Sequence, residues 1–237
     1  MKLLFTLLSL GSILLAFPQE SKVYFDDALS KYLVPYHKES SEAITNHEFE
    51  RAEFLFDSLM KFHLKGTYIP NLKLKKIPKG SIETDSLKNP FLLITNTSWY
   101  IQKEEEIESI NTMATQFKNQ IDIIVLYWDT LKNVKQLEKE YSKDIILTYV
   151  DETKNESENI VSTFKHSFGA PACFYVSNNK QLVSINKKFE LYKETINTPD
   201  ISFTDTYKRI AFLIFENDNS PKGTITTLDD EPDEKDY

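Results

Sequence analysis

The stretch that decides the fold is Phe91-Leu92-Leu93-Ile94-Thr95-Asn96-Thr97-Ser98-Trp99. Residues 91 to 95 form a continuous, largely apolar run, which is typical of a strand that is buried on both faces. After Trp99 the chain carries apolar residues at helical spacing, namely Ile107, Ile110, Ala114 and Phe117. A buried strand followed by an amphipathic helix predicts the first half of a β-α-β unit.

The same pattern recurs twice further along the chain. Residues 121–127 and 145–150 are apolar runs, and the segment between them carries Leu131, Val134, Leu137 and Tyr141 on one helical face. Buried strands that alternate with amphipathic helices predict parallel strands covered on both sides. The sequence therefore predicts an α/β core with a central sheet and helices on both faces.

The last part of the core changes character. Two strand-like runs, 172–176 and 181–185, are separated only by Ser177-Asn178-Asn179-Lys180, which suits a tight antiparallel turn. A final helix is indicated by Phe203, Tyr207, Ile210, Ala211 and Ile214. The predicted sheet is therefore mixed, with a late hairpin and a closing helix.

Ahead of the core we expect a helical segment over residues 17–66. A helical face is formed by Ala52, Leu55, Phe56, Leu59, Met60 and His63, with Gly66 as a stop. The earlier part, around Tyr24 to Tyr36, predicts a second helix that is broken at Pro35. Residues 71–77 alternate and are followed by a second short alternating piece after Pro78-Lys79-Gly80-Ser81, which predicts a β-hairpin.

The two ends of the chain indicate export and a charged tail. Residues 1–16 carry one lysine, an unbroken apolar stretch and a small residue at Ala16, the pattern of a signal peptide. The stretch is shorter than a membrane span, so we expect no span after its removal and a periplasmic or extracellular protein. The tail, 219–237, has six acidic residues against Lys235 between Asp229 and Tyr237, and a disordered segment is favoured over calcium binding.

Charge and composition exclude several classes of ligand. The formal net charge is -8 without a concentrated basic stretch, which argues against a nucleic-acid partner. The four histidines are scattered and indicate no metal site, and no glycine-rich phosphate loop is present. We expect no cofactor. The single cysteine, Cys173, lies at the start of an apolar strand, where a buried, inert thiol is favoured over a reactive one.

Three segments in the correct order resemble the thioredoxin-like superfamily, and within it the exported TlpA-like redoxins. The run from Leu87 to Trp99 is similar to the first core strand leading into the family's Trp-Cys-x-x-Cys site. Residues 106–111 match the helix after that site, and Gly169-Ala170-Pro171-Ala172 resembles the loop in which a cis-proline faces the two thiols. The resemblance covers about residues 70 to 215 and implies a thioredoxin-like domain over 67–218.

Transferred residue by residue, the resemblance places Tyr100 on the nucleophilic cysteine and Lys103 on the resolving cysteine. A phenol with a pKa near ~10 and an ammonium group cannot exchange disulfides, because only a thiolate attacks sulfur. The three glutamates that follow, Glu104 to Glu106, are interpreted as a charged helix start. The usual redox site is therefore expected to be inactive.

Three functions are compatible with these residues. The first is a peptide- or protein-binding module in which Trp99, Tyr100, Ala170 and Pro171 form the binding surface. The second is a thiol-disulfide oxidoreductase or antioxidant redoxin that works through Cys173 or through a partner's thiols. The third is an accessory protein whose N-terminal helices mediate assembly. Because a fold does not determine a function, the alternatives remain open at this stage, and an enzyme is the less favoured one.

Overall fold

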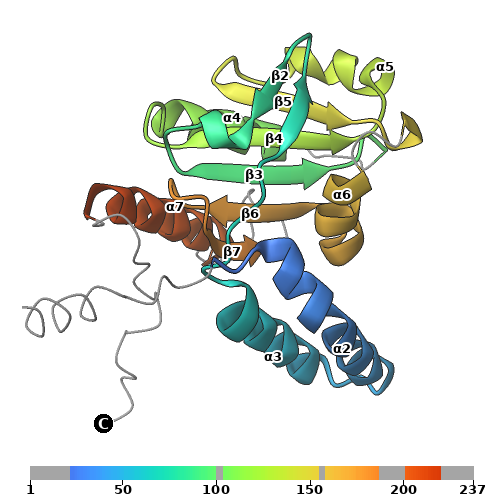
Figure 1. The fold of residues 1–237 in the computed structure, drawn as a ribbon. Helices are drawn as coiled ribbons and strands as arrows, with labels where there is room; N and C mark the ends of the chain where they lie inside the picture. The colour runs from blue at the N-terminus through green and yellow to red at the C-terminus, as the bar shows by residue number, and fades with distance from the viewer. Residues whose placement is uncertain (1–21, 100–103, 155–157, 187–200, 220–237) are drawn as a thin grey trace, which may run out of the picture.

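A seven-stranded mixed sheet with helices on both faces forms the centre of the computed structural model (Figure 1). The structure describes residues 22–99, 104–154, 158–186 and 201–219. The signal peptide and the acidic segment predicted at the two ends lie outside the described residues, as do Tyr100 and Lys103. Among the helices of the described ranges, none has the length and apolar character needed to cross a bilayer.

The sheet has the strand order β2-β1-β5-β4-β3-β6-β7. Its strands are β1 (Lys73–Lys76), β2 (Ser81–Glu83), β3 (Phe91–Asn96), β4 (Asp122–Trp128), β5 (Ile145–Val150), β6 (Ala172–Val176) and β7 (Leu182–Asn186). Strands β3, β4 and β5 pair in parallel, whereas β6 is antiparallel to β3, and β7 is antiparallel to β6. The predicted α/β core, the late hairpin and the mixed sheet are thereby confirmed. The predicted β1–β2 hairpin also forms, and it joins the sheet through antiparallel pairing of β1 with β5.

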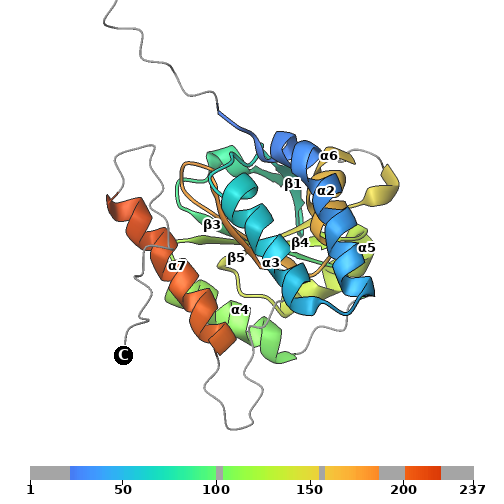
Figure 2. The same cartoon turned by 90° about the horizontal axis from the view of Figure 1, so that it is seen from below.

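Two buried clusters lie on the two faces of the sheet. Helices α4 (Glu104–Gln116) and α7 (Ile201–Asn219) cover one face, where Ile110 and Ile210 are fully buried. The two helices run side by side (Figure 2), and Tyr207 on α7 donates a hydrogen bond to Gln116 at the end of α4 over 2.9 Å. This face also buries Cys173 of β6.

The opposite face is covered by the N-terminal helices and by the segment before β6. That segment contains the short helix α6 (Glu158–Ile160), which continues as a π-helical stretch over Val161–His166. Phe25 of helix α2 (Phe25–Thr45) packs against Phe164, Phe168 and Phe174, with ring centroids 5.8, 5.9 and 6.4 Å away. The first turn of α2 is therefore anchored in the same core as strand β6.

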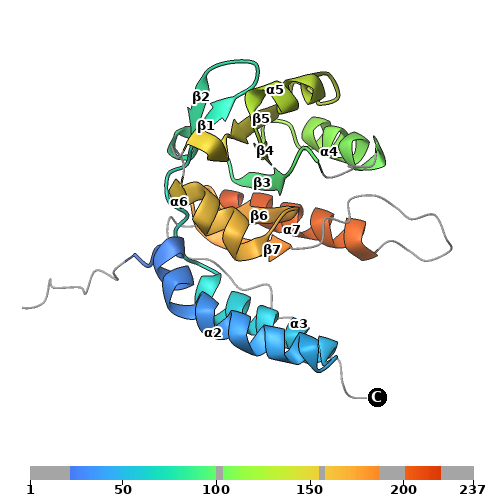
Figure 3. The same ribbon diagram turned by 90° about the vertical axis from the view of Figure 1, so that its right-hand side faces the viewer.

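The N-terminal helices form an antiparallel pair that extends from the β7 side of the sheet (Figure 3). Helix α3 (Phe49–Leu59) is followed by a π-helical turn over Met60–Leu64. The predicted break at Pro35 is wrong, because α2 continues through this proline to Thr45. Tyr36 and Ala43 beyond the proline are buried, and this packing offsets the ~3 kcal/mol that an interior proline costs a helix. The helix ends instead before His47, which has a positive φ of 60°.

The predicted helix after β4 is shorter than expected. Only Leu131–Val134 is α-helical (α5), and Lys135–Lys139 continues as a 3-10 helix. Leu131, Val134 and Leu137 are spaced by three residues, which is the repeat of a 3-10 helix rather than of an α-helix. The apolar face was therefore predicted correctly, but its helix type was not.

The start of the β7 edge is covered by residues 66–69, which connect the N-terminal helices to the core. The Gly66 amide donates to the Leu182 carbonyl over 2.8 Å, and the Leu182 amide donates to the Thr67 carbonyl over 2.9 Å. The Ile69 amide donates to the Lys180 carbonyl over 2.8 Å. The first residue of β7, Leu182, therefore has backbone partners on its outer side as well.

Candidate functional site

The candidate site lies at the carboxyl ends of the parallel strands, where β3 ends and β6 begins. Thr95 near the end of β3 is paired with Ala172, the first residue of β6, and its hydroxyl donates to the Ala172 carbonyl over 3.2 Å. Trp99 follows Thr95 by four residues, and Pro171 directly precedes Ala172. The sheet therefore brings Trp99 and the Ala170-Pro171 peptide to the same edge.

Trp99 is the most exposed large hydrophobic residue of the described part of the chain, with 76% of its surface accessible. An indole ring of this size is usually at least half covered in a folded protein, and exposed aromatic rings are enriched at binding surfaces. Ala170 and Pro171 are half-buried, and their peptide bond is cis. Both precede the β3–β6 ladder, which begins at Ala172, so their backbone lies outside the sheet.

A hydrogen-bonded carboxylate stands beside Trp99. Asp129 directly follows β4, and its carboxylate accepts hydrogen bonds from the Ser98 hydroxyl, the Thr130 amide and the Asn133 side-chain amide, the last over 2.9 Å. Partial burial is the largest single influence on the pKa of Asp129 and raises it, but these hydrogen bonds together hold the pKa below its usual value. Asp129 was not among the predicted site residues, although an acid at the carboxyl end of a parallel strand was visible in the sequence.

Replacing Asp129 with asparagine tests this network. The pKa of Asp129 is lowered in the folded state, so the ionised carboxylate stabilises the fold above the unfolded pKa of about 3.9, and this contribution is lost as the pH falls through the lower folded value. We expect Asp129→Asn to lower the free energy of unfolding at pH 7 by on the order of 1 kcal/mol, because the group is partly exposed. The difference should stay constant above about pH 5 and shrink as the pH falls below the unfolded pKa of about 3.9 in urea titrations. If the difference in the free energy of unfolding between the two proteins did not change with pH, the proposed role of the ionised Asp129 carboxylate would be wrong.

Two further buried polar groups lie near the site. Thr97 is buried, and its hydroxyl has no hydrogen-bond partner among the described residues. Glu106 in the first turn of α4 is also buried, with 3% of its surface accessible. Its charge is one of the influences that raise the pKa of Tyr127, after burial and the neighbouring Tyr141. The burial of Glu106 could not be predicted, because it depends on how α4 lies over β4.

The one thiol of the chain is buried in β6 and is not exposed at this surface. Cys173 is 1% exposed within β6, and burial raises its pKa well above the usual value, although a hydrogen bond with Tyr175 and the charge of Arg209 act in the opposite direction. Its side chain belongs to the cluster beneath α4 and α7. Within the described ranges no three metal-binding side chains come together.

Comparisons with known proteins give structural similarities at low sequence identity. The thioredoxin domain of a thiol-disulfide oxidoreductase from Bacteroides vulgatus shares 13% identity at a TM-score of 0.48, over 62% of this chain and 97% of that chain. A secreted disulfide oxidoreductase from Mycobacterium tuberculosis shares 12% identity at a TM-score of 0.44, over 59% and 94% of the two chains. A thiol:disulfide interchange protein from a Bacteroides species shares 13% identity at a TM-score of 0.44, over 57% and 92%. No protein-family model and no curated protein sequence matches the chain.

The topology of the chain itself carries the fold assignment. A parallel β3-α4-β4 unit is joined, on the other side of β3, by the antiparallel hairpin β6–β7, and α7 packs beside α4. The loop after β3 and the proline before β6 lie at the same end of the sheet. The chain has a thioredoxin-like fold.

Proposed function

We propose that this protein binds an extended polypeptide segment at the surface formed by Trp99, Tyr100, Ala170 and Pro171, and that it does so without thiol chemistry. The observation that supports the proposal is the exposed indole of Trp99, which follows β3 at the end of the sheet where β6 begins after the Ala170-Pro171 peptide. An aromatic platform next to backbone groups outside a ladder suits an extended chain, since the ring covers side chains while the backbone supplies hydrogen bonds.

The thiol content of the chain supports the non-redox part of the proposal. Thiol-disulfide exchange by the thioredoxin-type mechanism needs a nucleophilic thiolate and a second thiol that resolves the mixed disulfide. The chain has one cysteine, and the positions that correspond to the two thiols hold Tyr100 and Lys103. Because Cys173 is buried and its pKa is raised, it is protonated at neutral pH and shielded from a protein disulfide.

We further propose that the protein is exported to the periplasm or the extracellular space. The support is the leader pattern of residues 1–16. Mass spectrometry of the secreted protein is expected to find a new N-terminus directly after Ala16. Retention of Met1 in the exported protein would contradict cleavage at this position.

Binding of an unfolded polypeptide tests the proposed surface. A reduced, alkylated protein that remains unfolded in buffer serves as the probe, and anisotropy of a dye on the probe reports the dissociation constant. We expect a variant with Trp99→Ala and Tyr100→Ala to bind it at least ~10-fold more weakly, because aromatic anchors at interface centres commonly contribute about 2 kcal/mol.

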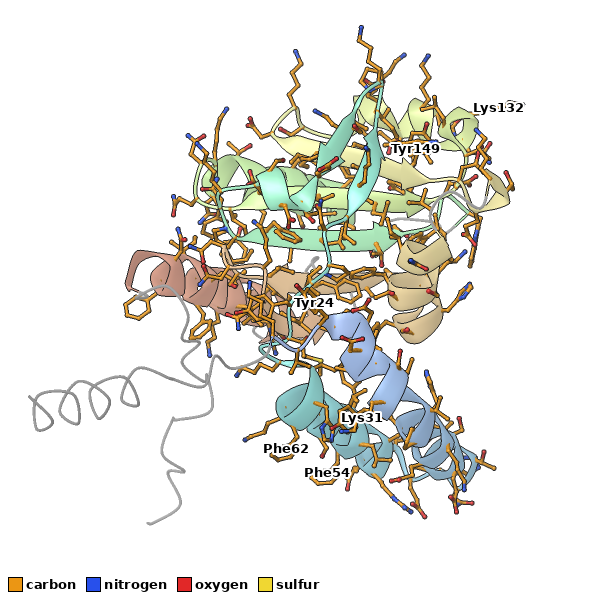
Figure 4. The ribbon with its side chains drawn as sticks, in the orientation of Figure 1. Tyr24, Lys31, Phe54, Phe62, Lys132 and Tyr149 are labelled. Carbon is orange, nitrogen blue, oxygen red and sulfur yellow. The ribbon has the colours of Figure 1, made fainter. Side chains whose placement is uncertain are left out.

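The matched control is Phe62→Ala. Phe62 is 69% exposed, and together with Phe54 it points away from the sheet at the end of α3 (Figure 4). This change removes a comparable aromatic surface far from the candidate site and should leave the dissociation constant within twofold. If the Trp99 and Tyr100 variant bound as tightly as the unchanged protein, the proposed surface would be wrong.

A further inference from the structure

A second concave surface lies beside the β1–β2 hairpin. It encloses about 1050 Å³ between the hairpin, the end of β5, the start of α5 and residues 159–160. Leu131, Tyr149 and Ile160 contribute apolar surface to it. Tyr149 lies close to the hairpin, and Lys132 marks the neighbouring helix α5 (Figure 4). We call this surface the hairpin cavity.

The hairpin cavity is positively charged in a protein of net charge -8. Four of its lining residues are lysines, namely Lys73, Lys75, Lys76 and Lys79, and one is an acid, Asp151. The Asp151 carboxylate is already occupied, because it accepts hydrogen bonds from Thr153 and lies 3.2 Å from the Lys154 ammonium. The Lys73 ammonium lies 3.5 Å from the carboxylate of Glu83 on β2. The four lysines still outnumber Asp151 and Glu83 together, which leaves this part of the surface with a local positive potential.

The size of the hairpin cavity indicates a polypeptide rather than a small anion. Its volume is at the upper end of the ~300–1,000 Å³ that is typical of small-molecule pockets, and it is open to solvent. Lysines around apolar side chains suit a segment that carries carboxylates together with a few apolar residues. An inorganic anion would leave the apolar part of the surface uncovered.

The chain itself contains such a segment. Residues 228–237 read Leu-Asp-Asp-Glu-Pro-Asp-Glu-Lys-Asp-Tyr, in which six acids and one lysine stand between Leu228 and Tyr237. Ten residues lead from Asn219, the last residue of α7, to Asp229, and an extended chain of that length spans up to ~35 Å. Helix α7 contacts β6, and β1 lies four strands away, which corresponds to ~19 Å of sheet. The extended length of the segment therefore exceeds the separation of β6 and β1 across the sheet.

From this charge complementarity and reach, we propose that the acidic segment Asp229–Asp236 binds in the hairpin cavity of its own chain. The lysines would contact its carboxylates, and Leu228 or Tyr237 would cover the apolar side chains. An acidic segment of another protein would then have to displace it. This inference does not depend on the function proposed for the Trp99 surface, because the two surfaces share no residue.

The experiment uses the full-length chain and a dye-labelled peptide of residues 225–237. In one variant the six acids of the segment are changed to their amides: Asp229→Asn, Asp230→Asn, Glu231→Gln, Asp233→Asn, Glu234→Gln and Asp236→Asn. We expect this variant to bind the added peptide at least ~5-fold more tightly than the unchanged protein, whose own segment competes. Binding should weaken as salt rises from ~20 to ~200 mM, because the contacts are between charges.

The lysines are tested in the same amide background. Changing Lys73, Lys75, Lys76 and Lys79 to glutamine is expected to weaken peptide binding at least ~10-fold. The matched control changes four exposed lysines elsewhere to glutamine: Lys31, Lys38, Lys88 and Lys208. It alters the net charge by the same amount and should leave binding within twofold. Equal losses in both variants would overturn the proposal, as would absence of peptide binding. If competition by the protein's own acidic segment increased with protein concentration, the segment would bind a second copy of the chain, and the proposed binding within one chain would be wrong.

Discussion

Replacing Phe25 with alanine is expected to lower the free energy of unfolding by about 3–5 kcal/mol. The Phe25 ring is fully buried, and it contacts Phe164, Phe168 and Phe174 on the sheet side of the core. Its removal leaves a cavity between α2 and β6, because these three rings are held by other contacts and cannot close the space. Relative to a total stability of about 5–15 kcal/mol, the loss is large.

Urea unfolding followed by tryptophan fluorescence and far-ultraviolet circular dichroism measures this effect. The matched control is Phe54→Ala, which makes the same chemical change on α3 at a position that is 68% exposed. Because its ring is mostly in water, it should change the free energy of unfolding by no more than about 0.5 kcal/mol. Similar small effects of both changes would show that α2 does not share the core of the sheet.

Alkylation of Cys173 by iodoacetamide is expected to be on the order of 1000-fold slower in the folded protein than in urea at the same pH. Two properties of the site combine to produce this difference. The thiol is 1% exposed, so the reagent needs an opening of the structure, and burial raises the pKa of Cys173, so little thiolate is present. Mass spectrometry of time points measures both rates.

A second cysteine on the surface provides the control. Phe215 on α7 is 62% exposed, and a Phe215→Cys variant should be labelled at that position within a few-fold of the rate in urea. Rapid labelling of Cys173 in the folded protein would contradict the buried-thiol interpretation. If insulin reduction were also observed and were lost on Cys173→Ser, the oxidoreductase alternative would replace the proposed binding function.

The central sheet was predictable from sequence because its signals are local. Strands β3, β4 and β5 are apolar runs, and the turn between β6 and β7 consists of polar residues that favour tight turns. The path of α2 through Pro35 was not predictable, because the packing that offsets the proline comes from residues beyond it and from other elements. Local propensity describes the cost of an interior proline but not the contacts that compensate for it.

The candidate site was predictable only in part. The sequence pointed to Trp99, Ala170 and Pro171, and the pairing of Thr95 with Ala172 brings their segments to one edge of the sheet. The bond between Ser98 and Asp129 was missed, because it joins residues that are 31 positions apart at the ends of two different strands. Such a contact depends on the register of β3 and β4, which periodicity alone does not define.

Residues 66–69 affect how the folded protein can associate with other chains. An open strand edge is a template for edge-to-edge aggregation, and here Leu182 at the start of β7 accepts a hydrogen bond from the Gly66 amide and donates one to the Thr67 carbonyl. The opposite edge is the three-residue strand β2, next to the lysine-rich β1, and short strands and lysines are both known to discourage strand addition. The N-terminal connection thus covers the start of the β7 edge, and variants that detach it are expected to form more β-rich aggregates than the unchanged protein.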